Sequence, residues 1–218
     1  MNTTLSYIAQ KFNVNLASKL PITIDGTNRK IMAQTWCELG FTKGVEIGVA
    51  DGKHSEILCV NNPNLHLYAI DPWEQYSGYI DYTRGRLDYF YTHATQRLQP
   101  YNITILRKKS MEAVVDFADG ELDFVYIDGA HDFKSVAEDV CDWARKVRVG
   151  GVVYGHDYYW RTDKPSNVIH VRHVIAAYTY SHHIRPWFAL SAYHNKADRT
   201  SEDRVQSWMF VRQDTDRL

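Results

Sequence analysis

Short apolar segments alternate with amphipathic segments through most of this chain, and this alternation limits the folds open to it. The apolar segments span residues 44–49, 65–71, 103–108, 123–128 and 150–155. Between them, apolar residues recur every three or four positions, which predicts helices that include residues 55–60, 84–99, 110–118 and 133–147. Nearly continuous apolar strands separated by helices are typical of a parallel sheet covered on both faces. We therefore predict an α/β fold with a doubly wound, mostly parallel sheet.

The C-terminal part departs from this alternation. One helical segment, 168–182, is followed by two strand-like segments, 185–194 and 204–213, with only the polar loop 195–203 between them. Two successive strands without an intervening helix are expected to pair antiparallel. We predict that this pair closes an edge of the sheet and supplies its antiparallel C-terminal strand.

The N-terminal part is more polar. The pattern of residues 27–40 predicts a helix with Thr27 as its N-cap and Gly40 at its end. A length of 218 residues suits one domain with a substantial core. We expect an N-terminal extension over residues 1–26 and a single catalytic domain over residues 27–218.

Composition excludes several classes of protein. Lys and Arg total 25 against 26 Asp and Glu, a formal net charge of −1, so no overall positive field attracts a nucleic acid. The apolar runs are shorter than the roughly 18 to 20 residues that cross a bilayer, and the polar start resembles no signal peptide. We expect a cytoplasmic protein with no membrane and no nucleic-acid partner; a homo-oligomer is left open.

A glycine loop and an acid suggest a nucleoside ligand. Gly48 and Gly52 follow the first predicted strand and allow a tight turn before a helix N-terminus, while Asp71 ends the second strand, where a carboxylate can accept both ribose hydroxyls. The loop lacks the middle glycine of a dinucleotide motif, and Asp51 places an anion where a pyrophosphate would lie. A sulfonium ligand without phosphate would instead gain from Glu46 and Asp51, which favours S-adenosylmethionine.

Four motifs carry a resemblance to a known family. They are GVEIGVADGKHSEIL, YAIDPW, DFVYIDGAHDFKSVAEDV and RVGGVVYGHDY, in this order along residues 27–212. Together they resemble class I S-adenosylmethionine-dependent methyltransferases, whose fold is Rossmann-like. The I-D-G-x-H and G-H-D-Y elements resemble a branch that contains small-molecule and sugar O-methyltransferases together with cephalosporin-hydroxylase-like proteins.

This resemblance implies roles for several residues. Glu46, Gly48 and Gly52 would line the methionine end of the cofactor, and Asp71 would hold the ribose. Ser110 and Met111 would flank the adenine. Asp128, after the fourth strand, is also expected near the cofactor. The chain departs from many members of the family at Ala50, where they carry a further glycine.

Acids and imidazoles gather at the ends of the fourth and fifth strands. Asp128 and His131 follow one strand, and His156 and Asp157 follow the next. Neighbouring parallel strands lie about 4.8 Å apart, so these side chains can converge. A hydroxyl acceptor needs a base or a metal to lose its proton. His131 or His156, with Asp128, is the candidate base, and Asp128, His156 and Asp157 are candidate ligands for Mg or Mn.

We expect an S-adenosylmethionine-dependent methyltransferase that acts on oxygen of a small hydroxylated molecule, such as a sugar or natural product. Two alternatives remain: a metal-dependent hydroxylase-like relative, and a catalytically silent cofactor-binding subunit. The tyrosine-rich stretch with Tyr76, Tyr79 and Tyr82 is either a lid over the acceptor or part of a homo-oligomer interface.

Overall fold

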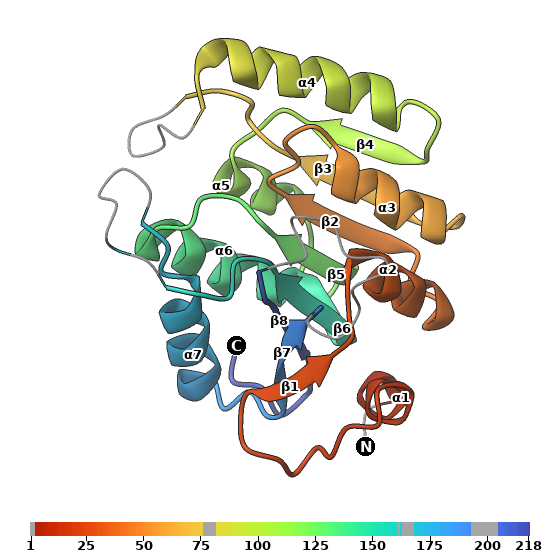
Figure 1. Ribbon diagram of the computed structural model, residues 1–218, viewed down its shortest axis with the longest axis vertical. Coiled ribbons are helices and arrows are strands. Elements are labelled where there is room, and N and C mark those ends of the chain that lie inside the picture. Colours follow the sequence, from red (N-terminus) through yellow and green to blue (C-terminus); the bar gives the residue numbers. More distant parts are fainter. Residues whose placement is uncertain (1–2, 76–81, 161, 163–167, 193–204) are drawn as a thin grey trace.

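The computed structural model describes residues 3–75, 82–160, 162, 168–192 and 205–218. One eight-stranded sheet runs through the described part, with helices on both faces (Figure 1). The strands are β1 (Ile22–Asp25), β2 (Lys43–Ile47), β3 (His66–Ile70), β4 (Ile103–Leu106), β5 (Leu122–Ile127), β6 (Val147–Gly155), β7 (Trp187–Ser191) and β8 (Ser207–Val211). The helices are α1 (Thr3–Lys11), α2 (Arg29–Glu38), α3 (Lys53–Asn61), α4 (Arg84–Leu98), α5 (Ser110–Ala113), the 3₁₀ turn η1 (Val114–Asp116), α6 (Phe133–Lys146) and α7 (Val171–Ser181).

The strand order is β1-β7-β8-β6-β5-β2-β3-β4. All neighbouring strands are parallel except β8, which lies antiparallel between β6 and β7. The predicted α/β class, the mostly parallel sheet and the antiparallel C-terminal strand are thus confirmed. Since strand order reverses between β2 and β5, the carboxyl ends of β2, β5 and β6 form the edge where a ligand of such a sheet binds.

Two apolar layers hold the helices to the sheet. Helices α1, α2 and α3 cover one face around Trp36, Phe124 and Tyr154, and α4 extends that layer beside α3. Helices α5, α6 and α7 cover the other face around Trp143 and Phe210 (Figure 1). Both faces of the central strands are therefore buried, which explains why their sequences are almost continuously apolar.

Three details differ from the sequence expectations. Residues 22–25 of the expected N-terminal extension form β1, which pairs in parallel with β7, so β1 rather than the C-terminal pair closes that edge of the sheet. Asn28, not Thr27, caps α2, because its side chain accepts from the Ile31 amide. Gly150 and Gly151 lie within β6, opposite a break in its register with β5, rather than in a turn before it. The domain boundary expected at residue 26 remains a prediction.

Within the described residues, no helix combines the length and the apolar character that a membrane span requires.

A substitution at Gly44 on β2 would test the packing of the apolar layer around Trp36 and Phe124. A Cβ at this position would lie 2.1 Å from the Phe124 ring, which is itself stacked against Trp36 and Phe41 and cannot move aside. We expect Gly44→Ala to lower the free energy of unfolding by about 1 to 3 kcal/mol, measured by urea denaturation. Gly85→Ala in α4 is the matched control, because its Cβ would meet no atom within 4 Å. Equal effects of the two changes would contradict this account of the packing.

Candidate active site

The glycine loop after β2 makes close backbone contacts. Gly48 has a φ of +85°, and a Cβ there would lie 2.0 Å from the carbonyl oxygen of Asp128. Gly52 has a φ of +79° and faces Ala94 of α4, whose Cα would lie 3.2 Å from an added Cβ. Ala50 adopts a φ of +49°, in the region that favours glycine. The alanine that departs from the family pattern therefore occupies a glycine-like conformation at a cost of about 1 to 2 kcal/mol.

Asp71 holds this loop in place. Its Oδ2 accepts hydrogen bonds from the amides of Val49 (3.0 Å) and Ala50 (3.1 Å), and its Oδ1 accepts from the amide of Trp73 (2.7 Å). Burial raises the pKa of Asp71, while these three amide donors act in the opposite direction. Asp71 thus lies at the loop as expected, but it also fixes the loop's backbone, a role that the sequence did not indicate. Its contact with a ribose remains a prediction.

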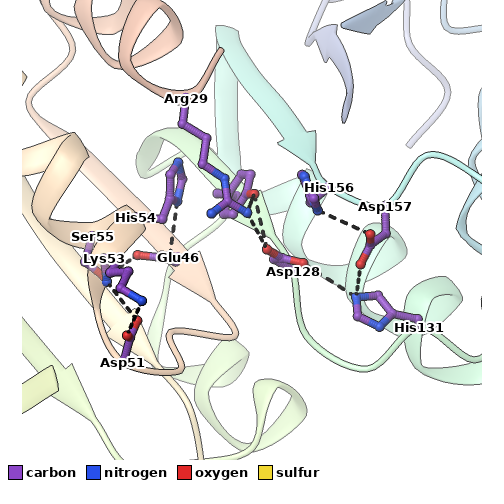
Figure 2. A network of polar contacts seen from close by, with 11 residues as sticks. Arg29, Glu46, Asp51, Lys53, His54, Ser55, Asp128, His131, His156 and Asp157 are labelled. Carbon is purple, nitrogen blue, oxygen red and sulfur yellow. Dashed lines mark hydrogen bonds and ion pairs between the residues drawn. The ribbon is translucent and has the colours of Figure 1, made fainter. Parts of the chain in front are cut away.

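Glu46 lies beneath the loop and is 1% exposed. Its carboxylate accepts a hydrogen bond from Ser55, and its Oε1 lies 3.1 Å from Nδ1 of the buried His54 (Figure 2). Asp51 instead pairs with Lys53, whose Nζ lies 2.8 Å away. Both oxygens of Glu46 are therefore engaged inside the protein, and His54 is a buried partner that sequence spacing gave no reason to select.

Ser110 and Met111 begin α5. The Ser110 hydroxyl donates to the buried carboxylate of Asp139 and accepts from Nε1 of Trp143 at 2.8 Å, so it joins α5 to α6. Burial raises the pKa of Asp139 to about 7. Met111 is partly buried against the same core. The expected contact of these residues with an adenine remains a prediction.

The acid and imidazole group converges at the ends of β5 and β6, as predicted (Figure 2). His131 Nε2 lies 2.9 Å from Oδ2 of Asp157 and 3.5 Å from Oδ1 of Asp128. One nitrogen and two carboxylate oxygens from these residues lie within 4.8 Å of one another, an arrangement that can hold a metal ion. We call Asp128, His131 and Asp157 the donor group.

His156 lies beside the donor group, and its expected role as a metal ligand or base remains a prediction. It is 8% exposed, and its Nδ1 lies 3.3 Å from Oδ1 of Asp157. The structure therefore places His131 with Asp128 and Asp157, whereas the sequence had favoured His156 as the imidazole of this set.

Two residues that the sequence did not single out complete the surroundings of Asp128. Arg29 of α2 lies with its NH2 atom 3.3 Å from Oδ2 of Asp128 and 3.3 Å from the hydroxyl of Tyr126. That hydroxyl also donates to Asp128 at 3.2 Å. Arg29 lies nearly 100 positions from Asp128 in the sequence, so only the fold brings them together.

Charge pairing sets the protonation of the donor group. Burial alone would lower the pKa of His131, but the adjacent carboxylates of Asp128 and Asp157 raise it to about 10. Burial opposes ionisation of Asp157, yet the adjacent imidazoles of His131 and His156 lower its pKa overall. His131 is therefore an imidazolium at neutral pH in the metal-free protein, and in this state it does not act as a base.

The tyrosine-rich stretch is only partly described. Tyr76 and Tyr79 lie outside the described residues. Tyr82 packs edge-on against Phe90 of α4, with ring centroids 5.1 Å apart.

We expect the free energy of unfolding to depend on pH through His131. Its pKa rises from 6.5 to about 10 on folding, so its contribution is fully present below pH 6.5 and is lost as the pH rises through 10. In urea titrations with EDTA, His131→Gln should therefore be most destabilising near about pH 6 and less so toward about pH 10. His93→Gln, at a partly exposed position on α4 away from the donor group, is the control. If the difference in unfolding free energy between wild type and His131→Gln does not shrink as the pH rises, the pKa assigned to His131 is contradicted.

Comparisons with solved structures identify the fold. The O-methyltransferase TomG from Streptomyces achromogenes, crystallised with SAM, is 16% identical with a TM-score of 0.62, covering 97% of this chain and 91% of TomG. Cofactor-bound Rv0187 from MTB is 14% identical with a TM-score of 0.63, covering 96% of this chain and 88% of that one. The O-methyltransferase from Bacillus cereus, in complex with SAH, is 13% identical with a TM-score of 0.61. The match covers 97% of this chain and 92% of the Bacillus cereus protein. At these identities the similarity establishes the fold.

Sequence comparisons gave a match to a family model but none to a curated protein. No curated protein matches the chain. A family model described as a methyltransferase domain matches residues 45–158, more than half of the chain and the part that contains the glycine loop and the donor group. This match confirms the resemblance to methyltransferases, and the chain belongs to the methyltransferase domain family.

Proposed function

We propose that this protein transfers a methyl group from S-adenosylmethionine to a hydroxyl oxygen of a small molecule. The observation that carries the proposal is the donor group at the ends of β5 and β6, beside the glycine loop of a methyltransferase-family chain. TomG and the Bacillus cereus protein are O-methyltransferases crystallised with SAM and SAH, which supports the same cofactor here. Structural neighbours also include an N-methyltransferase and an rRNA methylase, so the fold alone does not select the acceptor atom.

The donor group is the reason for choosing oxygen. An amine with a free lone pair attacks a sulfonium without first losing a proton, whereas a hydroxyl is a poor nucleophile until it is deprotonated. Two carboxylates and an imidazole at one point suit this task. Their position next to the loop supports a role at the point where an acceptor would meet the transferred methyl.

The cofactor side of the site is formed by the loop and Asp71. The turn from Gly48 to Gly52 precedes the N-terminus of α3, and Asp71 fixes two of its amides. We assign the ribose contact to Asp71, and the methionine end to the loop. The methyl sulfonium is positively charged and would gain from the nearby Asp128 and Asp157.

The donor group fits a divalent ion by its chemistry. One imidazole nitrogen and two carboxylate oxygens suit Mg or Mn, and the separations of 2.9 and 3.5 Å match neighbouring ligands around one ion. We infer that Asp128, His131 and Asp157 hold the ion. Such an ion lowers the pKa of a bound hydroxyl. His131 must be neutral to ligate it, so metal and proton compete for Nε2, while Arg29 keeps the other oxygen of Asp128 in place.

The net charge also bears on the class of acceptor. A net charge of −1 supports a small-molecule acceptor rather than a nucleic acid. A cytoplasmic location and a homo-oligomer remain predictions.

The function is tested by calorimetric titration with S-adenosylmethionine and by a mass-spectrometric screen. Hydroxylated sugars and phenols are incubated with protein, Mn²⁺ and trideuteromethyl-labelled cofactor, and one product is expected to gain the labelled methyl. Failure to bind S-adenosylmethionine would overturn the proposal. Binding of cofactor and Mn²⁺ without transfer to any member of the panel would favour the hydroxylase-like or the catalytically silent alternative.

Asp71→Ala should weaken S-adenosylmethionine binding by about 1.5 to 3 kcal/mol, or roughly 10- to 150-fold in Kd, because charged hydrogen bonds to the ribose and the loop are lost. Calorimetry measures the change, and circular dichroism verifies the fold. Asp88→Ala, on the exposed face of α4, is the control and should bind normally. An unchanged Kd for Asp71→Ala would exclude the ribose assignment.

Mn²⁺ binding, followed by electron paramagnetic resonance, separates the two possible imidazole ligands. Asp157→Asn and His131→Gln should each weaken binding by at least about tenfold. His156→Gln should change it little, because its Nδ1 faces Asp157 from outside the donor group. Glu138→Gln on α6 is the surface control. Loss of binding in His156→Gln with retention in His131→Gln would restore the ligand set expected from the sequence.

A further inference from the structure

Two large aromatic side chains lie exposed next to the donor group. Trp160 is 52% exposed and comes three positions after Asp157, and Phe133 is likewise exposed and comes two positions after His131. The other five of the six tryptophans are at most 6% exposed. The protein therefore buries its tryptophans everywhere except beside the proposed site of methyl transfer.

Helix α7 joins the two segments that carry these rings. The His170 amide donates to the carbonyl of His131 at 2.9 Å, and the Phe133 amide donates to Nδ1 of His170 at 3.1 Å. The Arg172 amide donates to the carbonyl of Tyr159 at 3.2 Å. Both segments are thus fixed to the start of α7, which packs beside α6 (Figure 1).

The indole of Trp160 has a defined position although it is exposed. It contacts the imidazole of His173 on α7, with ring centroids 5.6 Å apart and an interplanar angle of 51°. About half of the indole surface remains in solvent. One exposed apolar residue needs no explanation, but Trp160 and Phe133 lie together beside a candidate active site, which indicates a surface for a ligand.

Polar groups next to these rings are engaged within the protein. One carboxylate oxygen of Asp132 accepts from the amides of Lys134 and Ser135, and the other accepts from the Ser135 hydroxyl. Nδ1 of His170 accepts from the Phe133 amide. A sugar presents several hydroxyls that need such acceptors, whereas an aromatic ring needs a flat apolar surface. The surface thus suits an aromatic ring better than a sugar.

We propose that Trp160 and Phe133 bind the acceptor, and that the acceptor presents an aromatic ring to Trp160. The proposal rests on the proposed function, because the acceptor is the molecule that receives the methyl. A ring in this place lies next to the donor group, so a hydroxyl on the ring or close to it reaches the proposed base and metal ligands. Trp160 and Phe133 select the acceptor and take no part in the transfer itself.

A matched pair of alcohols tests the contact with Trp160. Benzyl alcohol and cyclohexylmethanol carry the same primary hydroxyl, but only benzyl alcohol has an aromatic ring. Iodide reaches exposed tryptophans and not buried ones, so its quenching of tryptophan fluorescence reports on Trp160. The quenching should disappear in Trp160→Phe, which verifies the signal. Both alcohols are titrated without and with S-adenosylhomocysteine.

We expect benzyl alcohol to protect Trp160 from iodide at a concentration about 2- to 12-fold lower than cyclohexylmethanol, which is the range for an aromatic pair. A surface that is only apolar would show the opposite order, because the saturated ring has the larger apolar area.

Variants separate ring stacking from damage to the fold. In ligand-detected NMR titrations, Trp160→Ala should abolish the preference for benzyl alcohol, whereas Trp160→Phe keeps a ring and should retain it. Phe133→Ala should weaken the binding of both alcohols. Tyr180→Ala removes another exposed ring, at the far end of α7, and should change neither affinity. Calorimetry should give the same affinity for S-adenosylmethionine in all four variants.

Three results would overturn the proposal: protection by cyclohexylmethanol at the same or a lower concentration, no protection by either alcohol in either form of the protein, or unchanged benzyl alcohol binding in Trp160→Ala and Phe133→Ala. Normal binding of S-adenosylmethionine would then leave the proposed function in place. Failure to bind S-adenosylmethionine would overturn the proposed function instead, and the iodide measurement without cofactor still decides whether Trp160 binds an aromatic ring.

Discussion

The contact between Gly48 and the carbonyl of Asp128 determines how the two halves of the site meet. With 2.0 Å between that oxygen and a built Cβ, only glycine allows the end of β2 to lie against the end of β5. This approach brings the loop held by Asp71 next to the side chain of Asp128. The proposed cofactor and acceptor chemistry are therefore neighbours because of one backbone contact, which no side chain could replace.

The partly buried charges beside this contact compensate one another. Asp128 and Asp157 face His131, and Arg29 lies on the far oxygen of Asp128. Removal of one partner leaves a partly buried charge without compensation, which is more destabilising than loss of an exposed ion pair. Asp157 also adopts a φ of +51°, a strained conformation that turns its carboxylate toward His131. Strain of this kind persists where the surrounding structure enforces it, and it is concentrated at functional sites.

The sequence predicted features that depend on local pattern. The buried strands, most helices and the strand ends that carry Asp128, His131, His156 and Asp157 followed from apolar runs and their spacing. It did not predict β1, because four residues with alternating burial are a weak strand signal and only pairing with β7 defines the strand. It also did not separate His131 from His156, since spacing locates a strand end but not the backbone turn at Asp157.

Local sequence pattern could not predict contacts between segments that are distant in the sequence. Arg29 and His54 face Tyr126 from two different helices, and neither has a spacing that marks it as part of a site. Neither was among the site residues that the sequence suggested. Their position depends on how α2 and α3 pack together over the sheet, which is a property of the whole layer.

The family model matches only the central part of the chain, which contains the residues proposed for the reaction. Residues 45–158 include the loop, Asp71 and the donor group, whereas helix α2 with Arg29 and strands β7 and β8 lie outside them. The residues proposed for methyl transfer are thus inside the matched region, and the flanking segments add α2, β7 and β8 around it. A fold shared with O-methyltransferases, an N-methyltransferase and an rRNA methylase can serve different acceptors if the central strands keep the reaction and the flanking elements select what reaches it.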